Sequence, residues 1–307
     1  MAAVIAVPIL LIWQKNNVYD AWRLHNYQPP QSIVNLANDD SFKPYTRHLF
    51  YVNHPQLISS VAGFRENCPE NMQTIVLGCY HPNQRGIYIY DVQDPALAGV
   101  QQVTAAHEVL HSVYARLSTE DRNSLNAELE DYYKNGLTDP RVLAEVKLYQ
   151  QTEPNDVMDE MSCTFGTEIA NLPPSLEAYY AKYFTNRQAI VTFEQSYEGE
   201  FTSRQNQINA DDQRLAQMKQ QIQAEEDQLS SQLNSIKSNR SRVESSNDET
   251  QINEFNAQVN AYNSGVSRLK ADINEYNNLV QSRNAIAADL ASLQSALDTR
   301  LTTQSAK

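Results

Sequence analysis

The sequence has few basic residues, few cysteines and no long hydrophobic run. Of its 307 residues, 24 are Lys or Arg and 37 are Asp or Glu, which gives a net charge of −13 at pH 7. Residues 201–307 contribute only −2 of this charge, from 11 basic and 13 acidic side chains, so residues 1–200 carry −11. An acidic first part repels a phosphate backbone, and nucleic acid is therefore not an expected partner. Peptides with basic side chains suit it better, as a weak preference.

The most apolar stretch, residues 2–13, is interrupted by Pro8. A membrane-spanning helix needs about 20 apolar residues, so this stretch is too short. It also lacks the basic residues with which a signal peptide begins. Three interpretations stay open: the end of a truncated membrane anchor or signal, a weak signal-peptide core, or a buried first element. The first two are favoured, and they predict an extracytoplasmic protein, secreted or membrane-anchored, whose N-terminus is a candidate membrane contact.

Only three cysteines occur, at positions 68, 79 and 163. Cys68 and Cys79 flank a short connection in a β-rich part of the chain, and they can form a disulfide if the protein is exported. Two unrelated buried thiols are the alternative. Cys163 is interpreted as a small core residue, although a thiol at this place could also compete for a metal.

Histidine is scarce as well: the chain has six, and none follows His111. His107 and His111 are four residues apart, so on a helix both imidazoles lie on one face, with Glu108 beside them. The residues around them, 104–113, carry no other charge, which predicts a buried helix over about 104–117. Two imidazoles at this spacing can hold zinc while the glutamate activates a water molecule. A chance match on an ordinary core helix is the alternative.

This segment resembles the extended signature of the zincins, a group of zinc metallopeptidases. The resemblance implies that His107 and His111 bind Zn²⁺ and that Glu108 is the general base in peptide-bond hydrolysis. Zincins whose third ligand is a histidine need glycine and histidine where this chain has Tyr114 and Leu117, so they are excluded. The chain is more similar to the gluzincins, in which a later helix supplies a glutamate ligand.

Glu160 is the expected third ligand. A helix is predicted to begin near Asn155, and Glu160 lies one turn inside it among apolar residues. A carboxylate buried without a partner is costly, and zinc is a suitable partner. Glu168 is the second choice because Gly166 is expected to end the helix, and Glu145 is the third. An exposed helix glutamate is the other interpretation of Glu160.

The resemblance leaves two parts of the site open. Gluzincins similar to thermolysin have an acid four residues after the ligand glutamate, where this chain has Thr164, so the groups behind the metal ligands are not assigned. Zincins often stabilise the oxyanion with a tyrosine or a histidine. In this chain Tyr114 and Tyr183 are the candidates for stabilising the oxyanion. Three other tyrosines, which the sequence does not rank against them, are Tyr149, Tyr179 and Tyr180.

A sheet is expected just before the zinc helix. Residues 74–80 and 87–92 are β-rich and are separated by a turn, which predicts a hairpin. Zincins have a strand here that pairs with an extended peptide or protein substrate, so the resemblance gives this part to 87–92 or to its partner. Further helices are expected to open near residues 118, 139, 155 and 173. The prediction is an α+β zincin-like domain over residues 14–190.

From about residue 191 the composition changes: no proline follows Pro174, and no cysteine or tryptophan occurs. Apolar residues recur every seven positions at Phe201, Ile208, Leu215, Ile222, Leu229, Ile236 and Val243, and again from Ile252 onward. A strict heptad predicts a left-handed coiled coil. The polar residues 245–250 separate two helices, so residues 191–307 are expected to form an all-α antiparallel coiled-coil hairpin. Self-association through the second helix is the alternative, and a polar disordered tail is the least favoured interpretation.

The expected function is therefore zinc-dependent peptide-bond hydrolysis. The alternative is an envelope or surface interaction protein, in which the coiled coil is the working part and the zincin-like domain is an inactive remnant or scaffold. The complete motif argues against the alternative, because sequence drift would have no reason to keep Glu108.

Overall fold

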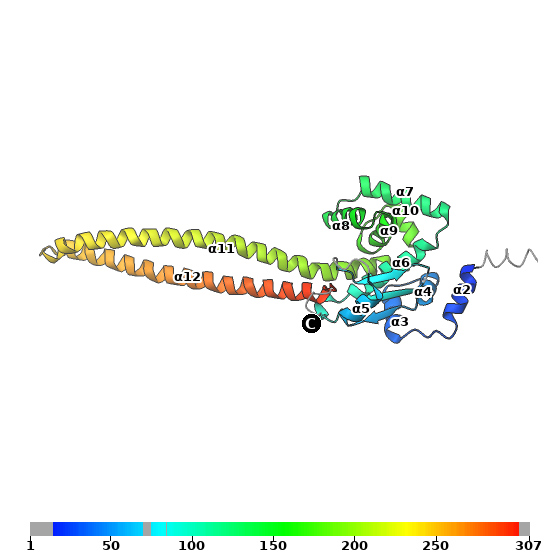
Figure 1. The fold of residues 1–307 in the computed structure, drawn as a ribbon. Coiled ribbons are helices and arrows are strands. Elements are labelled where there is room, and N and C mark those ends of the chain that lie inside the picture. Colours follow the sequence, from blue (N-terminus) through cyan, green and yellow to red (C-terminus); the bar gives the residue numbers. More distant parts are fainter. Residues whose placement is uncertain (1–14, 70–74, 84, 301–307) are drawn as a thin grey trace, which may run out of the picture. The chain divides into compact units, whose positions relative to one another are not determined.

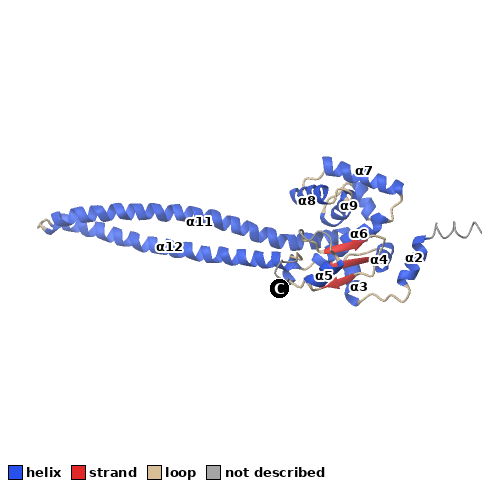
Figure 2. Cartoon of the chain, viewed as in Figure 1, coloured by secondary structure: helices blue, strands red, loops and turns tan. Residues whose placement is uncertain are grey.

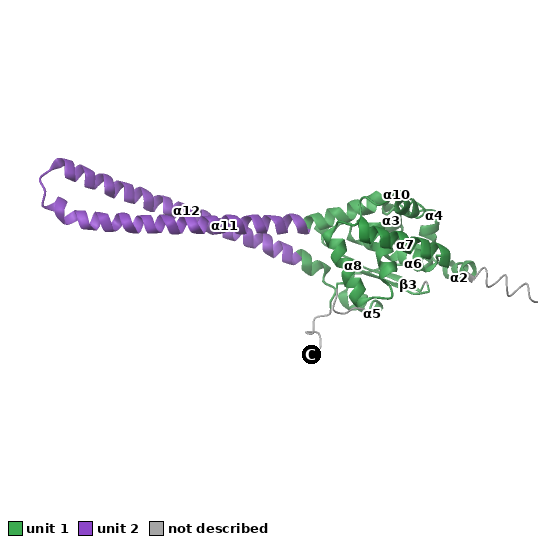
Figure 3. Cartoon of the chain, turned by 90° about the horizontal axis from the view of Figure 1, so that it is seen from above, with its two compact units in different colours: residues 1–200, 293–307 green, residues 201–292 purple. Residues whose placement is uncertain are grey.

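The computed structural model describes residues 15–69, 75–83 and 85–300. The apolar segment at residues 2–13 lies outside this range, as does Thr74 of the first expected strand. The described chain is mostly helical with a small sheet (Figures 1 and 2). None of the described helices is long and apolar enough to cross a membrane. The chain forms two compact units, one of residues up to Glu200 and from Leu293, the other of Phe201–Ser292 (Figure 3).

Short helices form the N-terminal part of the first unit. They are α2 (Lys15–Leu24), α3 (Gln31–Asp39), α4 (Pro44–Val52) and α5 (Val61–Asn67). Proline at the first position favours the start of α4, because its missing N–H has no partner in the first turn of a helix. The Ser60 side chain accepts a hydrogen bond from the backbone N–H of Gly63 and caps α5.

The sheet has three strands: β1 (Gln56–Ile58), β2 (Gly78–His81) and β3 (Gly86–Tyr90). The strand order is β1-β3-β2, with β1 parallel and β2 antiparallel to β3. The hairpin expected from the sequence is thus present with shorter strands, and β1 is an addition to it. Because β3 is in the middle, β2 is an edge strand.

Helix α6 (Val100–Ala115) is the centre of the first unit and follows a short 3₁₀ helix, η1 (Pro95–Leu97). It packs against α9 (Val157–Glu168) and against β2, β3, α3 and α4. It starts four residues earlier than the uncharged segment predicted, directly after Gly99. This glycine has φ 107°, and a side chain there would meet the backbone of Phe193. Both the turn and the packing therefore require glycine.

The remaining helices of this unit are α7 (Thr119–Asn135), α8 (Pro140–Thr152) and α10 (Pro174–Tyr180). Their starts lie where the sequence predicted them. The expectation that Gly166 ends α9 is wrong, because the helix continues to Glu168. A Cβ atom at Gly166 would lie 2.6 Å from the ring of Tyr180 and 2.7 Å from Leu110 Cδ1. Gly166 thus allows α9 to pack closely on its neighbours.

The second unit consists of parts of α11 (Arg187–Glu244) and α12 (Glu249–Leu297). The two helices run antiparallel, as Arg204 bonds to Asp289 at 2.6 Å and Gln221 to Asp272 at 3.1 Å. The turn between them falls in the expected polar break. The long helices form the hairpin predicted from the heptads (Figure 1). Its N-terminal boundary lies near residue 200 instead of 190, because the first turns of α11 pack within the first unit.

The chain returns to the first unit at its end, which corrects the expectation that all of residues 191–307 belong to the hairpin. The second unit, Phe201–Ser292, is called the arm below. The Thr299 hydroxyl donates to the carbonyl of Val76 at 2.7 Å and accepts from the Val76 N–H at 3.3 Å. The Arg65 guanidinium donates to the Thr299 carbonyl at 2.7 Å and to its hydroxyl at 3.2 Å. Thr299 is 0% exposed and Arg65 is 4% exposed, so this contact is part of the interior.

Candidate metal centre

Helix α6 places His107, Glu108 and His111 together. The histidine side chains are 17% and 13% exposed, and their ring centroids are 5.0 Å apart. Glu108 is more deeply buried, at 5% exposed. The four-residue spacing therefore has the effect predicted from it, with two imidazoles on one helix face and a carboxylate beside them.

Helix α9 brings Glu160 to the two imidazoles. One carboxylate oxygen, Oε2, lies 3.4 Å from His107 Nε2, and the other, Oε1, lies 3.6 Å from His111 Nε2. Burial alone would raise the pKa of Glu160, but the charge of His111 and the bond with His107 lower it below its usual value. The residue that the sequence favoured as third ligand is thus an ionised carboxylate facing both histidines.

The other two glutamates considered as ligands have different partners. Glu168 bonds to Arg141 Nη1 at 2.5 Å, and Glu145 accepts a hydrogen bond from the Tyr149 hydroxyl at 2.8 Å. Burial and the nearby charge of Glu145 raise the pKa of Glu168 to about 7. Both residues line the same cleft as the histidines, but neither carboxylate forms an ion pair with them in the described part of the chain.

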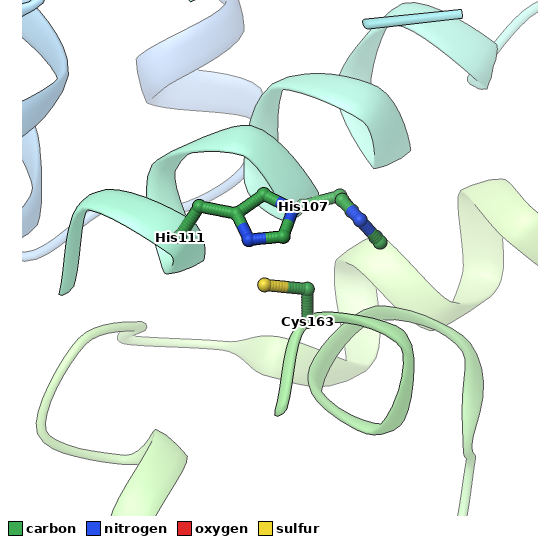
Figure 4. Close-up of side chains that lie close together, drawn as sticks. All are labelled: His107, His111 and Cys163. Carbon is green, nitrogen blue, oxygen red and sulfur yellow. The ribbon is translucent and has the colours of Figure 1, made fainter. Parts of the chain in front are cut away.

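Cys163 and Asp159 complete the surroundings of the histidines. The Cys163 side chain points from α9 toward both imidazoles (Figure 4), and the ligand atoms of these three residues lie within 4.8 Å of one another. Asp159 Oδ1 lies 2.9 Å from His111 Nδ1, and the Cys163 thiol donates to the same oxygen at 3.8 Å. Burial raises the pKa of this thiol, which favours its neutral form. The Glu160 carboxylate faces the Nε2 atoms of both histidines as well, so Glu160 and Cys163 are both candidates for a third ligand.

In α6, the pKa values of His111 and Glu108 are both raised, for different physical reasons. Burial opposes a charge on His111, yet Cys163, Glu160 and Asp159 together leave its pKa well above the usual value. Burial raises the pKa of Glu108, while the two histidines act in the opposite direction. A buried glutamate with a raised pKa is a stronger base than one in water, which suits a group that accepts a proton.

The histidines open into a cleft of about 760 Å³. Its walls include α6, α8, α9, strand β2 and residues 75–77. A Cβ atom at Gly78 would lie 2.6 Å from Glu108 Oε1, so only glycine allows the strand backbone to approach this carboxylate. Of the two strands considered from the sequence, β2 is the one at the sheet edge beside the site.

The two tyrosines named as oxyanion candidates do not face the histidines with their hydroxyls. Tyr114 lines the cleft, but its hydroxyl donates to Asn126 Oδ1 at 2.9 Å. Tyr183 is not among the residues that line the cleft, because it packs against the rings of Tyr45 and Tyr179. The sequence could not show this, because contacts with residues of other segments, Asn126 for Tyr114 and Tyr45 for Tyr183, place the two side chains.

Two other tyrosines, Tyr149 and Tyr80, also line the cleft. Tyr149, which the sequence left unranked, lines the cleft and bonds to Glu145. The sequence did not single out Tyr80 as a site residue. Its ring is stacked on that of His111, with centroids 6.2 Å apart and planes 10° apart. The available signal was its place in the run 74–80, which was expected to form a strand before the helix that carries His107 and His111.

Cys68 and Cys79 are joined in a disulfide, with Cα atoms 5.9 Å apart. Cys68 follows α5, and Cys79 is the second residue of β2. The bond therefore ties the edge strand of the cleft to the neighbouring helix. Of the two interpretations of these cysteines, the structure has the bonded pair.

Comparisons of the chain with protein-family models, with curated proteins and with solved structures found no match. The site is therefore interpreted from its own chemistry. Two imidazole nitrogens and one carboxylate oxygen are a donor set that zinc binds in catalytic sites, where a further position stays open for water or substrate. The residues present fit that metal.

Proposed function

We propose that the protein is a zinc-dependent peptidase of the gluzincin type, with an α+β zincin-like unit that carries the coiled-coil arm. In this proposal His107, His111 and Glu160 hold the metal. The observation that carries it is the Glu160 carboxylate, whose two oxygens meet both Nε2 atoms across the contact of α6 with α9. When bound, zinc supplies Lewis acidity that makes a water molecule nucleophilic near neutral pH.

Glu108 is the proposed general base. It is buried next to both histidines, and burial raises its pKa, which matches a group that takes a proton near neutral pH. It accepts the proton of the attacking water and then donates it to the amine that leaves. The hydrolysis thus consumes one water, breaks one C–N bond and returns Glu108 to its ionised form.

The proposed substrate is an extended peptide or unfolded protein segment. Strand β2 is at the sheet edge beside Glu108, and an edge strand binds such a chain through backbone hydrogen bonds with little sequence selectivity. The Cys68–Cys79 disulfide supports an extracytoplasmic location, because disulfides persist in oxidising compartments.

Zinc content and zinc affinity test the metal site. Purified protein should bind about one zinc per chain, and His107→Ala or His111→Ala should lose it, since too few ligands remain for a tetrahedral site. Glu160→Ala should also weaken binding strongly, whereas Cys163→Ala and Glu168→Ala should retain the metal. Retained zinc in both histidine variants would refute the site. Loss in Cys163→Ala with retention in Glu160→Ala would show that sulfur is the third ligand.

Glu108→Gln tests the chemistry apart from the metal. The amide cannot accept the proton of the water, so the variant should keep its zinc and lose hydrolysis of fluorogenic peptides. Asp156→Ala is a control, because Asp156 is an exposed residue at the start of α9 in the same cleft. Undiminished turnover in Glu108→Gln would refute the general base. A wild-type protein that binds zinc but cleaves no peptide would instead favour the interaction protein with a scaffold domain.

A further inference from the structure

The two consecutive acids of α9 meet opposite edges of one imidazole. Glu160 Oε1 lies 3.6 Å from His111 Nε2, whereas Asp159 Oδ1 lies 2.9 Å from His111 Nδ1. The second contact is the shorter, and its length is that of a normal hydrogen bond. Asp159 is partly buried, with a side chain 24% exposed. The ring of His111 is therefore held between two carboxylates of the same helix.

The chemistry of imidazole gives the contact with Asp159 a consequence. A neutral histidine carries its proton on one ring nitrogen and a lone pair on the other. An ionised carboxylate only accepts hydrogen bonds, so Nδ1 must donate to Asp159. When the ring is neutral, as a metal ligand has to be, the lone pair is therefore left on Nε2. That nitrogen faces Glu160. This tautomer is the one that a metal held by Glu160 and the histidines requires.

We infer that Asp159 is a positioning residue, which orients His111 and fixes its tautomer for metal binding. The inference rests on the proposed zinc site. Thr164, at the position where the resemblance implied an acid, does not take this part, because its hydroxyl is buried without a hydrogen-bond partner among the described residues. The residue just before the ligand glutamate does so instead.

Cys163 lies one turn after Asp159 in α9 and contacts its carboxylate. Its thiol donates to the same Oδ1 atom that accepts from His111, at 3.8 Å. Cys163 is 0% exposed, whereas the Asp159 side chain is 24% exposed, so the contact is partly buried. The thiol thus contacts Asp159 as well as lying beside the two histidines.

Zinc affinity by chelator competition tests the inference, with Asp159→Ala, Asp159→Asn and the control Asp156→Ala. Groups that bind ligand histidines change metal affinity by about tenfold to a hundredfold when removed. Asp159→Ala should show such a loss. Asp159→Asn keeps an acceptor without the charge, so its loss should be smaller. Asp156→Ala should bind zinc as the wild type does, because Asp156 lies at the exposed start of the helix.

The ¹⁵N spectrum of the histidine side chains gives a readout that a general loss of stability would not change. In the zinc-loaded wild type, His111 should carry its proton on Nδ1. In Asp159→Ala, both tautomers should be present in the metal-free protein at high pH. If Asp159→Ala does not fold, the wild-type spectrum decides, and a His111 without a proton on Nδ1 overturns the inference.

The outcomes separate this inference from the proposed function. Wild-type protein without zinc affinity overturns both. Wild-type protein that binds zinc, together with an Asp159→Ala variant of equal affinity and the same His111 spectrum, overturns only the role of Asp159. A loss of equal size in Asp156→Ala would also overturn it, because general acidity of the cleft would then explain the effect.

Discussion

Replacing Thr299 by valine tests whether the C-terminal segment holds the wall of the cleft. Valine has almost the same volume as threonine, so the change removes the hydroxyl and leaves no cavity. The hydroxyl now serves the N–H and the carbonyl of Val76 and one N–H of Arg65. All of these groups are buried or half-buried, and Val76 itself lines the cleft two residues before β2.

The magnitude follows from the groups left without a partner. An unsatisfied buried donor or acceptor costs about 1–3 kcal/mol. Two of the three hydrogen bonds, at 3.3 and 3.2 Å, are long, so we expect a total of about 2–4 kcal/mol. Thr192→Val is the matched control, because the Thr192 hydroxyl is exposed and bonds only to the carbonyl of Gln188 in its own helix. Such a surface change should cost about 0.5 kcal/mol or less.

Local stability is the quantity to measure, because a chain with two units need not unfold in one step. Hydrogen exchange followed by mass spectrometry gives the opening free energy of residues 75–81 directly. Thr299→Val should lower protection there, whereas Thr192→Val should not. Unchanged protection in Thr299→Val would refute the idea that this hydroxyl stabilises the cleft wall. Equal losses in both variants would point to a general effect of removing a threonine hydroxyl.

Three further predictions concern burial. Burial raises the pKa of Glu168 from 4.5 to about 7. The wild type should therefore lose up to about 3 kcal/mol of stability as pH rises between these values, because in this range the carboxyl ionises freely only in the unfolded chain. Glu168→Gln should flatten this pH dependence in thermal melts, and an unchanged slope would contradict the prediction. Asp40 is 0% exposed, and burial raises its pKa well above 3.8. Asp40→Asn should therefore raise the melting temperature more at about pH 8 than at about pH 4. Equal increases at both pH values would show that the Asp40 charge does not cause the stabilisation. In the arm, Ile208 and Ile252 both lie at heptad positions, but Ile208 is 5% exposed and Ile252 is 38% exposed. Ile208→Asp should therefore lower the helix melting temperature seen by circular dichroism, while Ile252→Asp should not. Equal shifts would show that this difference in burial does not govern the stability of the arm.

Local periodicity explains what the sequence could predict. The spacing of His107 and His111 needs only a helix to bring the imidazoles together, and the heptads of the arm need only two helices in antiparallel contact. Glu160 required more, namely an acid on the apolar side of a later helix, and the same argument left Glu168 and Glu145 open. The structure separates them because only Glu160 reaches the histidines.

Contacts between distant segments explain what the sequence could not predict. Glycine is typical of a helix end, but Gly166 lies inside α9. Glycine is required there because Tyr180 leaves no room for a side chain. Tyr183 packs on the ring of Tyr45, a contact between distant segments that no spacing in the sequence indicates. The sequence did not indicate Asp159, because the resemblance implies an acid four residues after Glu160, whereas the acid that contacts His111 is the residue just before it.

The pairing of the two arm helices and the docking of the C-terminal segment in the first unit are linked through the entropy of loop closure. The first unit is made from chain on both sides of the arm, so its last segment must return across 92 residues, from 201 to 292. For a flexible loop of that length, closure costs on the order of 4 kcal/mol. The folded arm removes this cost, because its pairing already holds Arg204 beside Asp289, close to both ends of the loop. A molecule that stabilises the arm would thereby favour the buried state of Thr299, even if it touched no residue of the first unit.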